Sequence, residues 1–87
     1  MAKVEIYTTP WCGYCARAKA LLKRKGIAYD EIDVSNSPDE RDHMIERSAG
    51  RRTVPQIFVD GRHLGDSDEM AALDRAGKLD ALLNPTG

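Results

Sequence analysis

The sequence lacks several features that would place it in a well-marked class of proteins. Its 87 residues carry a formal net charge of −1, and they contain only two cysteines and no long apolar run. A nearly neutral chain gives no electrostatic reason to expect nucleic acid or an anionic membrane as a partner. A bilayer-spanning helix needs ~20 apolar residues, and the N-terminus goes straight into charged residues without an apolar signal segment. We therefore predict a cytoplasmic protein that binds neither a membrane nor nucleic acid.

The length and composition predict one small globular domain. Hydrophobic residues make up 41% of the sequence and charged residues 31%, which is ordinary for a globular protein. A chain of 87 residues is too short for two domains. We expect residues 1–87 to form a single domain with a modest core, and residues 84–87 to form a frayed tail.

The two cysteines stand together in Thr9-Pro10-Trp11-Cys12-Gly13-Tyr14-Cys15, between a predicted strand and a predicted helix. The first amides of a helix have no partner within it, and its dipole favours negative charge there. We therefore expect Cys12 to be held as a thiolate, the form that attacks disulfides. Cys15 lies one helical turn further on, close enough to form a disulfide with Cys12 after a modest adjustment.

Two other roles for the cysteines are weaker. A disulfide that closes a four-residue loop stabilises a fold by roughly 2 kcal/mol, against about 4.7 kcal/mol for a hundred-residue loop. Zinc would need further ligands, and His43 and His63 are too far apart in sequence for the spacing of a zinc finger. The pattern therefore favours a redox pair over a structural disulfide, a metal site or inert thiols, and we expect no metal ligands.

Alternating and apolar stretches predict four strands. The first covers 3–8 and is expected to be half-buried, with Val4 and Ile6 on the buried face and Tyr7 on the other, and the second covers 27–34. The third and fourth cover 56–59 and 62–64, and the Asp60-Gly61 turn between them is typical of a hairpin.

Helical spacing predicts helices over 13–25, from Pro38 to about residue 49, and from residue 67 onward, with a short helical piece at 78–83. Ser37 is expected to cap the second helix, with Glu40 completing a capping box, and Ser67 to cap the third. The apolar residues expected to face the core are Ala18, Leu21, Leu22, Met44, Ile45, Ala49, Met70, Leu73, Ala76, Leu79, Leu82 and Leu83.

The element order is therefore β-α-β-α-β-β-α. A strand, a helix and a second strand imply a right-handed crossover and a parallel pair, and the hairpin adds an antiparallel pair. We predict an α/β fold with a mixed four-stranded sheet, three main helices and helices on both faces.

Three motifs together resemble the glutaredoxins, most of all the short bacterial dithiol type. They are Cys12-Gly13-Tyr14-Cys15 at the first strand-helix turn, Thr53-Val54-Pro55 before the third strand, and Gly65-Asp66-Ser67-Asp68 before the last helix. The runs "AKALL" and "TVPQIF" extend the similarity over nearly the whole chain. The resemblance implies a thioredoxin-like fold and a cis peptide bond before Pro55. Val54 would then offer its backbone to an extended peptide beside Cys12, although Pro55 could instead only shape an edge strand.

The resemblance also implies glutathione as co-substrate, with no tightly bound cofactor. By similarity, Tyr14 flanks the bound disulfide, Thr53 and Val54 pair with the cysteinyl backbone, and Pro55 shapes that segment. The amides of Ser67 and Asp68 would receive the γ-glutamyl carboxylate, an anion at a helix N-terminus.

The activity implied is glutathione-dependent reduction of protein disulfides and of glutathionylated proteins by a monomer, with Cys12 attacking and Cys15 resolving. Two alternatives stay open: an electron donor to ribonucleotide reductase that is itself reduced by thioredoxin reductase, and a carrier of a [2Fe-2S] cluster held between two chains by Cys12 and glutathione thiolates. Glycine in place of the usual proline at Gly13 favours the carrier.

Two further departures from the family pattern concern glutathione. Position 9 is Thr9, where many glutaredoxins have a lysine that contacts glutathione, and Arg52 is a candidate to compensate. Asp66 replaces the second glycine of a Gly-Gly turn. Its carboxylate is expected either to pair with the ammonium group of the ligand or to repel its carboxylate.

Overall fold

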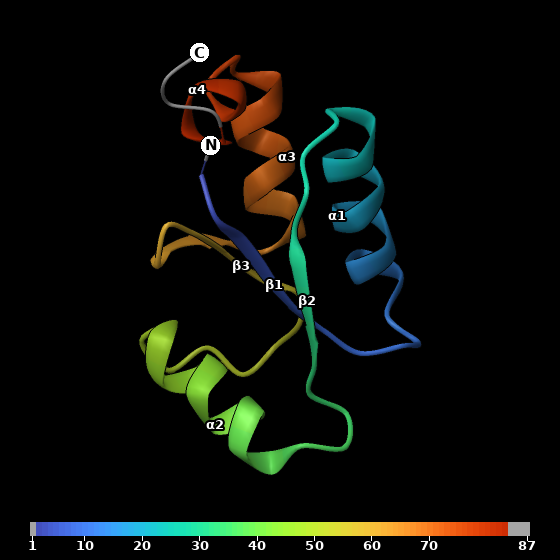
Figure 1. Cartoon of the computed structure of the whole chain (residues 1–87), viewed down its shortest axis with the longest axis vertical. Helices are drawn as coiled ribbons and strands as arrows, with labels where there is room; N and C mark the ends of the chain where they lie inside the picture. The colour runs from blue at the N-terminus through green and yellow to red at the C-terminus, as the bar shows by residue number, and fades with distance from the viewer. Residues whose placement is uncertain (1, 84–87) are drawn as a thin grey trace.

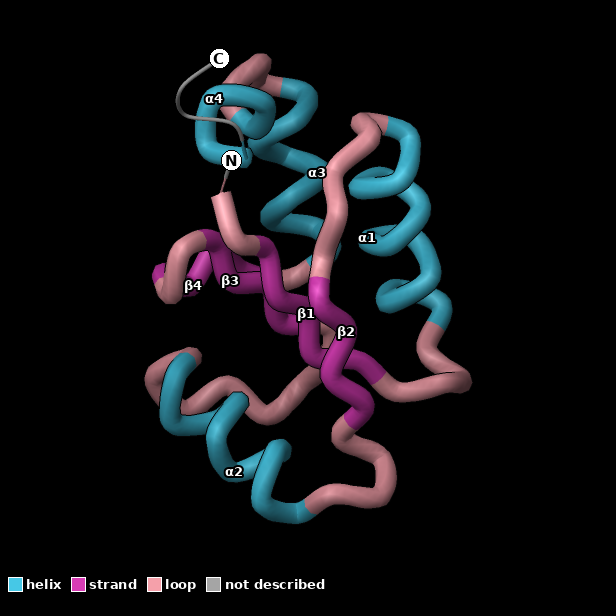
Figure 2. Tube along the Cα trace, in the orientation of Figure 1, coloured by secondary structure: helices cyan, strands magenta, loops and turns pink. Residues whose placement is uncertain are grey.

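The sheet has the strand order β2-β1-β3-β4 in the computed structural model, which describes residues 2–83. β1 (Val4–Thr8) pairs in parallel with β2 (Asp30–Asp33) and antiparallel with β3 (Gln56–Val59). β3 pairs antiparallel with β4 (Arg62–Gly65) through the predicted Asp60-Gly61 turn, where both residues have positive φ. Figure 2 shows the four strands side by side across the middle of the molecule. The mixed four-stranded sheet is confirmed; the predicted tail at 84–87 lies outside the described residues.

Helices cover both faces of the sheet, as predicted. Figure 1 shows α2 (Pro38–Arg47) on one side, and α1 (Gly13–Arg24), α3 (Ser67–Arg75) and α4 (Leu79–Leu83) on the other. The larger core lies between the sheet and these three helices, and its fully buried residues include Ile6, Leu22 and Met70. α1 and α2, which connect successive strands, thus pack on opposite faces of the sheet and hold the strand ends and the turns that follow them in place.

The smaller core lies under α2 and buries Tyr7, which is only 3% exposed. β1 is therefore buried on both faces, and the expectation of a half-buried strand is wrong. Arg47 of α2 donates hydrogen bonds to the Tyr7 hydroxyl at 2.8 Å and to Glu5 Oε1 at 2.9 Å. Its guanidinium also lies 4.1 Å from the centre of the Phe58 ring. A charged side chain thus closes the edge of an aromatic core.

β2 is shorter than the predicted 27–34 because residue 27 is hydrogen-bonded to the last turn of α1. The amide of Ile27 donates to the carbonyl of Leu22 at 3.0 Å, and Gly26 takes a positive φ of 70°. This is the hydrogen-bonding pattern of a Schellman motif. The residues just after Gly26 therefore close the helix before the strand can begin.

The helix boundaries and buried faces follow the predictions with three exceptions. Ala49, Ala76 and Leu82 were expected in the core and are exposed; Leu82 is 44% exposed. Ala49 has a positive φ of 59° in the turn that ends α2, where Gly50 donates to the carbonyl of Ile45 at 2.8 Å. These residues lie at helix ends, where the helical spacing no longer decides which side is buried.

Candidate active site

Cys12 is the N-cap residue of α1. It has extended backbone angles, and its Sγ accepts a hydrogen bond from the amide of Cys15 at 3.2 Å. A residue with these angles ends the loop from β1 and lets the helix start at Gly13. The sulfur thus lies against the first turn of the helix, where the unpaired amide and the dipole both favour negative charge. The predicted position of this sulfur is confirmed.

A second segment meets the same sulfur from the other side. The carbonyl oxygen of Val54 lies 3.7 Å from Cys12 Sγ, and the bond from Val54 to Pro55 is cis, as the resemblance implied. A protonated Cys12 can donate to this carbonyl. The Thr53-Val54-Pro55 segment, more than forty residues away in sequence, therefore forms one side of the site.

Cys15 lies in a different environment from Cys12. It is buried, with 1% exposure, whereas Cys12 is partly exposed. Burial, followed by the hydrogen bond with Cys12, raises the pKa of the Cys15 thiol to about 12. Cys15 therefore stays protonated at neutral pH. Because Cys15 is also buried, Cys12 is the sulfur that solvent and substrate can reach.

A cleft of about 330 Å³ brings together the predicted ligand-binding residues. All six of them line it, together with Asp66, so the cleft is bounded by Tyr14, Thr53, Val54, Pro55, Asp66, Ser67 and Asp68. Trp11 and Tyr14 stand beside the cysteines with exposures of 89% and 54%. Thr9 and Arg52 are not among the lining residues.

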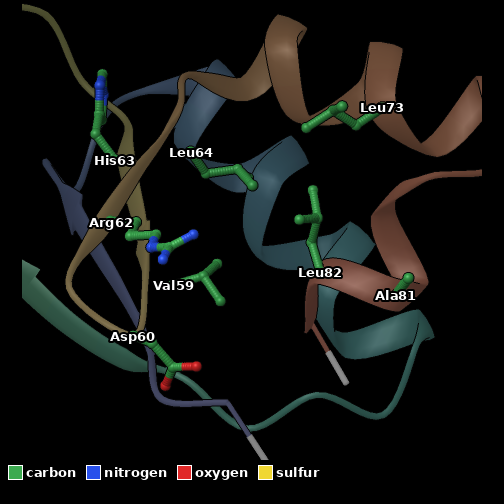
Figure 3. A pocket seen from close by; sticks show the side chains of 8 residues that line it. All are labelled: Val59, Asp60, Arg62, His63, Leu64, Leu73, Ala81 and Leu82. Atoms are coloured by element: carbon green, nitrogen blue, oxygen red, sulfur yellow. The ribbon is translucent and has the colours of Figure 1, made fainter. Parts of the chain in front are cut away.

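A larger cavity, of about 540 Å³, lies away from the cysteines. Figure 3 shows it between the β3–β4 hairpin and the two C-terminal helices, with His63, Leu73 and Leu82 among its lining residues. None of the motif residues lines it, whereas every residue that lines the smaller cleft belongs to one of the three motifs. The chemistry of the chain therefore belongs to the smaller cleft.

The helix that begins at the cleft is capped by Asp66, so the prediction that Ser67 caps it is wrong. Asp66 Oδ1 accepts from the amide of Glu69 at 2.9 Å, and Glu69 Oε1 accepts from the amide of Asp66 at 3.1 Å. This is a reciprocal capping box. Because Asp66 satisfies the amide of Glu69, the amides of Ser67 and Asp68 are the donors that this helix start offers to the cleft.

Arg51 joins the two walls of the cleft, a role that the sequence did not predict. Its guanidinium lies 3.0 Å from Asp66 Oδ2 and 2.6 Å from Glu69 Oε1, at the start of α3. Arg51 itself stands two residues before Thr53, on the opposite wall. The Asp-x-x-Glu spacing of residues 66 and 69 was the signal for the capping box, but nothing in the sequence pointed to Arg51 as its partner.

Both carboxylate oxygens of Asp66 are therefore engaged within the protein, one by the helix amide and one by Arg51. The two roles expected for Asp66 toward a ligand both assumed a free charge. In the structure Arg51 balances that charge. Asp66 acts here as a helix cap and as part of the connection between the walls.

Two further observations concern metal binding and membrane crossing. Within the described part of the chain, no three His, Cys, Asp or Glu side chains gather closely enough to hold a metal ion. Among residues 2–83, none of the helices combines the length and apolar character that a bilayer crossing requires.

Known proteins resemble this chain over nearly its full length. Residues 4–64 match the family model described as Glutaredoxin. Glutaredoxin 3 of Escherichia coli (strain K12) is 53% identical over 83 residues, which cover 95% of this chain and 99% of that protein. The glutaredoxin of Pseudomonas aeruginosa is 52% identical over 84 residues, which cover 97% of this chain and 99% of that protein.

Solved structures agree with these relatives. The solution structure of glutaredoxin from Brucella melitensis is 53% identical, with a TM-score of 0.86 over 100% of this chain and 94% of that one. The crystal structure of the buckwheat glutaredoxin-glutathione complex is 30% identical, also with a TM-score of 0.86, and the match covers 97% of this chain and 78% of that one. The fold is thus thioredoxin-like.

The site places a partly exposed sulfur at a helix start, with a buried partner thiol and a cis-proline segment beside it. This arrangement suits exchange between thiols and disulfides. Together with the matches in sequence and structure, it shows that this chain belongs to the glutaredoxin family and is a thiol-disulfide oxidoreductase.

Proposed function

We propose that this protein uses glutathione to reduce glutathionylated proteins and protein disulfides. The observation that carries the proposal is the cleft beside Cys12, which joins the Thr53-Val54-Pro55 segment to the start of α3. The similar buckwheat structure is that of a glutaredoxin-glutathione complex. The buckwheat protein shares the fold of this chain and 30% of its residues, which supports glutathione as the ligand here.

Each wall of the cleft suits one part of glutathione. The backbone of Thr53 and Val54 offers a donor and an acceptor to the cysteinyl residue, in the manner of an added strand. The amides of Ser67 and Asp68 at the start of α3 suit the γ-glutamyl carboxylate. Tyr14, half-exposed beside the cysteines, covers the disulfide.

The first step is attack by the Cys12 thiolate on the glutathione sulfur of a mixed disulfide. The protein-glutathione S–S bond breaks, and the substrate cysteine leaves as a thiolate that takes a proton from water. Glutathione is then bonded to Cys12. The thiolate of a second glutathione attacks the glutathione sulfur of this adduct, which regenerates Cys12 and forms glutathione disulfide.

A protein disulfide needs Cys15 as well. Cys12 attacks one substrate sulfur and forms a mixed disulfide with the protein. Cys15 then attacks Cys12 Sγ, its proton passes to the leaving substrate thiolate, and a Cys12–Cys15 disulfide forms. Because burial raises the pKa of Cys15 to about 12, it does not compete with Cys12 in the first step.

The test is turnover of a small glutathionyl disulfide with glutathione, glutathione reductase and NADPH. We expect Cys12→Ser to abolish turnover, and Cys15→Ser to retain it but to lose reduction of a protein disulfide. Turnover only when thioredoxin reductase replaces glutathione and glutathione reductase would instead support the alternative role, an electron donor to ribonucleotide reductase. Loss of both activities in Cys15→Ser would contradict the division of roles.

A second candidate function is transfer of a [2Fe-2S] cluster. A Cβ at Gly13 would meet nothing within 4 Å, so the surface beside Cys12 is open. One similar structure, 58% identical with a TM-score of 0.72, is described as "Metal Binding of Glutaredoxins". Since Cys15 is buried, one chain offers one thiolate. A cluster would therefore need Cys12 from two chains together with two glutathione thiolates.

Anaerobic reconstitution with iron, sulfide and glutathione, followed by visible spectroscopy and size-exclusion chromatography, tests this second function. A coloured dimer that forms only with glutathione would support it. A colourless monomer would rule it out and would leave the proposed monomeric, cytoplasmic oxidoreductase unaffected.

A further inference from the structure

A groove of about 470 Å³ runs between α1 and α3, next to the cleft. Ser67 and Asp68 line both the cleft and the groove, so the two adjoin each other. Figure 1 shows α1 and α3 side by side on the same side of the sheet. Cys12 caps α1 and Asp66 caps α3, so the groove follows both helices away from the end at which the reactive sulfur lies.

Three arginines line this groove, against one carboxylate. Arg17 and Arg24 come from α1, Arg75 comes from α3, and the carboxylate is that of Asp68. None of the ion pairs formed among residues 2–83 includes any of the three arginines. The groove therefore presents an excess of positive charge on a molecule whose formal net charge is −1.

The arginines are spaced along the groove and not clustered at one end. Arg17 and Arg24 are seven residues apart on one helix, which places them on the same face and about 10 Å apart along its axis. Arg75 lies in the last turn of α3. Small or apolar residues, including Ala18, Leu21 and Ala71, lie between these charges.

The end of the groove nearest the cysteines is joined to the active site by a direct contact. The guanidinium of Arg17 lies 5.4 Å from the centre of the Tyr14 ring, and Tyr14 lines the cleft. A chain whose cysteine reacts at Cys12 can therefore continue past Tyr14 into the groove.

We propose that this groove binds an acidic segment of the protein substrate whose cysteine reacts at Cys12. This inference rests on the proposed function and adds to it the class of protein that the enzyme favours. An extended segment advances about 3.3 Å per residue, while Arg17 and Arg24 lie five and twelve helical residues beyond Cys12, or about 8 and 18 Å along the helix. Carboxylates about two to six residues from the substrate cysteine would meet the arginines.

A nucleic acid is the other polyanion to consider. The groove is short, it has an apolar base and it holds Asp68, whereas nucleic-acid binding depends on neutralising many phosphates along an extended basic surface. The nearly neutral charge of the chain points the same way. The structure thus favours carboxylates on a flexible peptide.

The experiment compares glutathionylated peptides that differ only in residues two to six after the cysteine, with Glu, Gln or Lys at those positions. The protein is the full chain, assayed with glutathione and glutathione reductase. We expect kcat/KM to be about tenfold higher for the Glu peptide than for the Gln peptide at low ionic strength, which corresponds to about 1.4 kcal/mol. High salt should remove most of this preference.

The variant is Arg24→Glu with Arg75→Glu, which should abolish the preference for the Glu peptide and leave the rate on a small glutathionyl disulfide unchanged. The matched control is Lys23→Glu with Lys78→Glu. It makes the same change in net charge with two exposed residues that do not line the groove. Should the charge reversal unfold the protein, Arg24→Gln with Arg75→Gln removes the positive charges without adding negative ones.

Three results would overturn the inference: a wild type without preference, a control that loses the preference equally, or a single-stranded oligonucleotide that competes as well as a Glu-rich peptide does. Each leaves turnover of the small disulfide intact. Failure of the proposed function is distinct, because it would abolish that turnover in the wild type.

Discussion

Replacement of Asp66 by alanine and by asparagine separates the two interactions that hold the start of α3. Asp66 caps the helix through Oδ1 and pairs with Arg51 through Oδ2. Asp66→Ala removes both interactions. Asp66→Asn keeps a side-chain oxygen for the cap, because asparagine is an equally good N-cap residue, and loses only the charge that pairs with Arg51.

The magnitude follows from these two contributions. Loss of an N-cap costs about 1 kcal/mol, and an exposed ion pair contributes about 0.2–1 kcal/mol. Since the side chains of Arg51 and Asp66 are 36% and 31% exposed, the ion pair belongs to the weak class. We therefore expect Asp66→Ala to lower the free energy of unfolding by about 1–2 kcal/mol, and Asp66→Asn by less than about 1 kcal/mol. In a domain of this size, 1 kcal/mol shifts Tm by about 4–8 °C.

Thermal unfolding of the reduced protein measures both variants at low and high salt. The control is Ser37→Ala, which removes the N-cap of α2, where Ser37 Oγ accepts from the amide of Glu40 at 3.3 Å; Ser37 does not line the cleft. We expect it to resemble Asp66→Ala in Tm but to leave KM for glutathione unchanged. Equal losses for Asp66→Ala and Asp66→Asn would refute the assignment of Asp66 as the cap, and unchanged Tm in both would refute the whole reasoning.

Three further predictions concern stability. Met70→Ala, at a fully buried position, should lower the free energy of unfolding in urea by about 2–5 kcal/mol, whereas Leu82→Ala, at an exposed position, should change it little. Gly65→Ala should destabilise the protein in the same assay, because φ is 132° there and the added Cβ would lie 2.7 Å from the carboxylate that closes the capping box; a neutral result would contradict the crowding. The Arg47 hydrogen bond lowers the pKa of Glu5 below its ordinary value of 4.5, so its contribution to stability is present above that pH and lost as pH falls through the lower folded value. The stability difference between wild type and Arg47→Gln should therefore shrink in acid to the part that comes from the contacts of Arg47 with Tyr7 and Phe58, and a difference that is the same at about pH 2 as at neutral pH would argue against this ion pair.

The sequence predicted the order of the elements and the sheet because local signals agreed with one another. The Asp60-Gly61 turn, the Ser37-Pro38 helix start and the helical spacing of α1 each point to one structure. The resemblance to the glutaredoxins added the cis bond at Pro55, which the residues alone do not reveal. The resemblance also predicted that Thr53 and Ser67 line one cleft, although they come from different parts of the chain.

The errors lie where contacts between distant residues decide the outcome. Tyr7 alternates with apolar residues and was assigned to an open face, but α2 covers it. Serine is a common N-cap residue, which led to the prediction for Ser67, but Asp66 forms the capping box with Glu69 and is the N-cap. Half of the box predicted for α2 is present, since Ser37 accepts from the amide of Glu40. Arg51 could not be found at all, because its partners become neighbours only after folding.

The position of Cys12 as the cap of α1 has a consequence for redox equilibrium. A thiolate accepts an amide hydrogen bond more strongly than a disulfide sulfur does, so when Cys12 is ionised the Cys15 amide stabilises the dithiol form over the oxidised one. Around a closed thermodynamic cycle, that difference raises the reduction potential of the pair. The helix start therefore does more than prepare the nucleophile, because it also favours the reduced form of the cysteine pair.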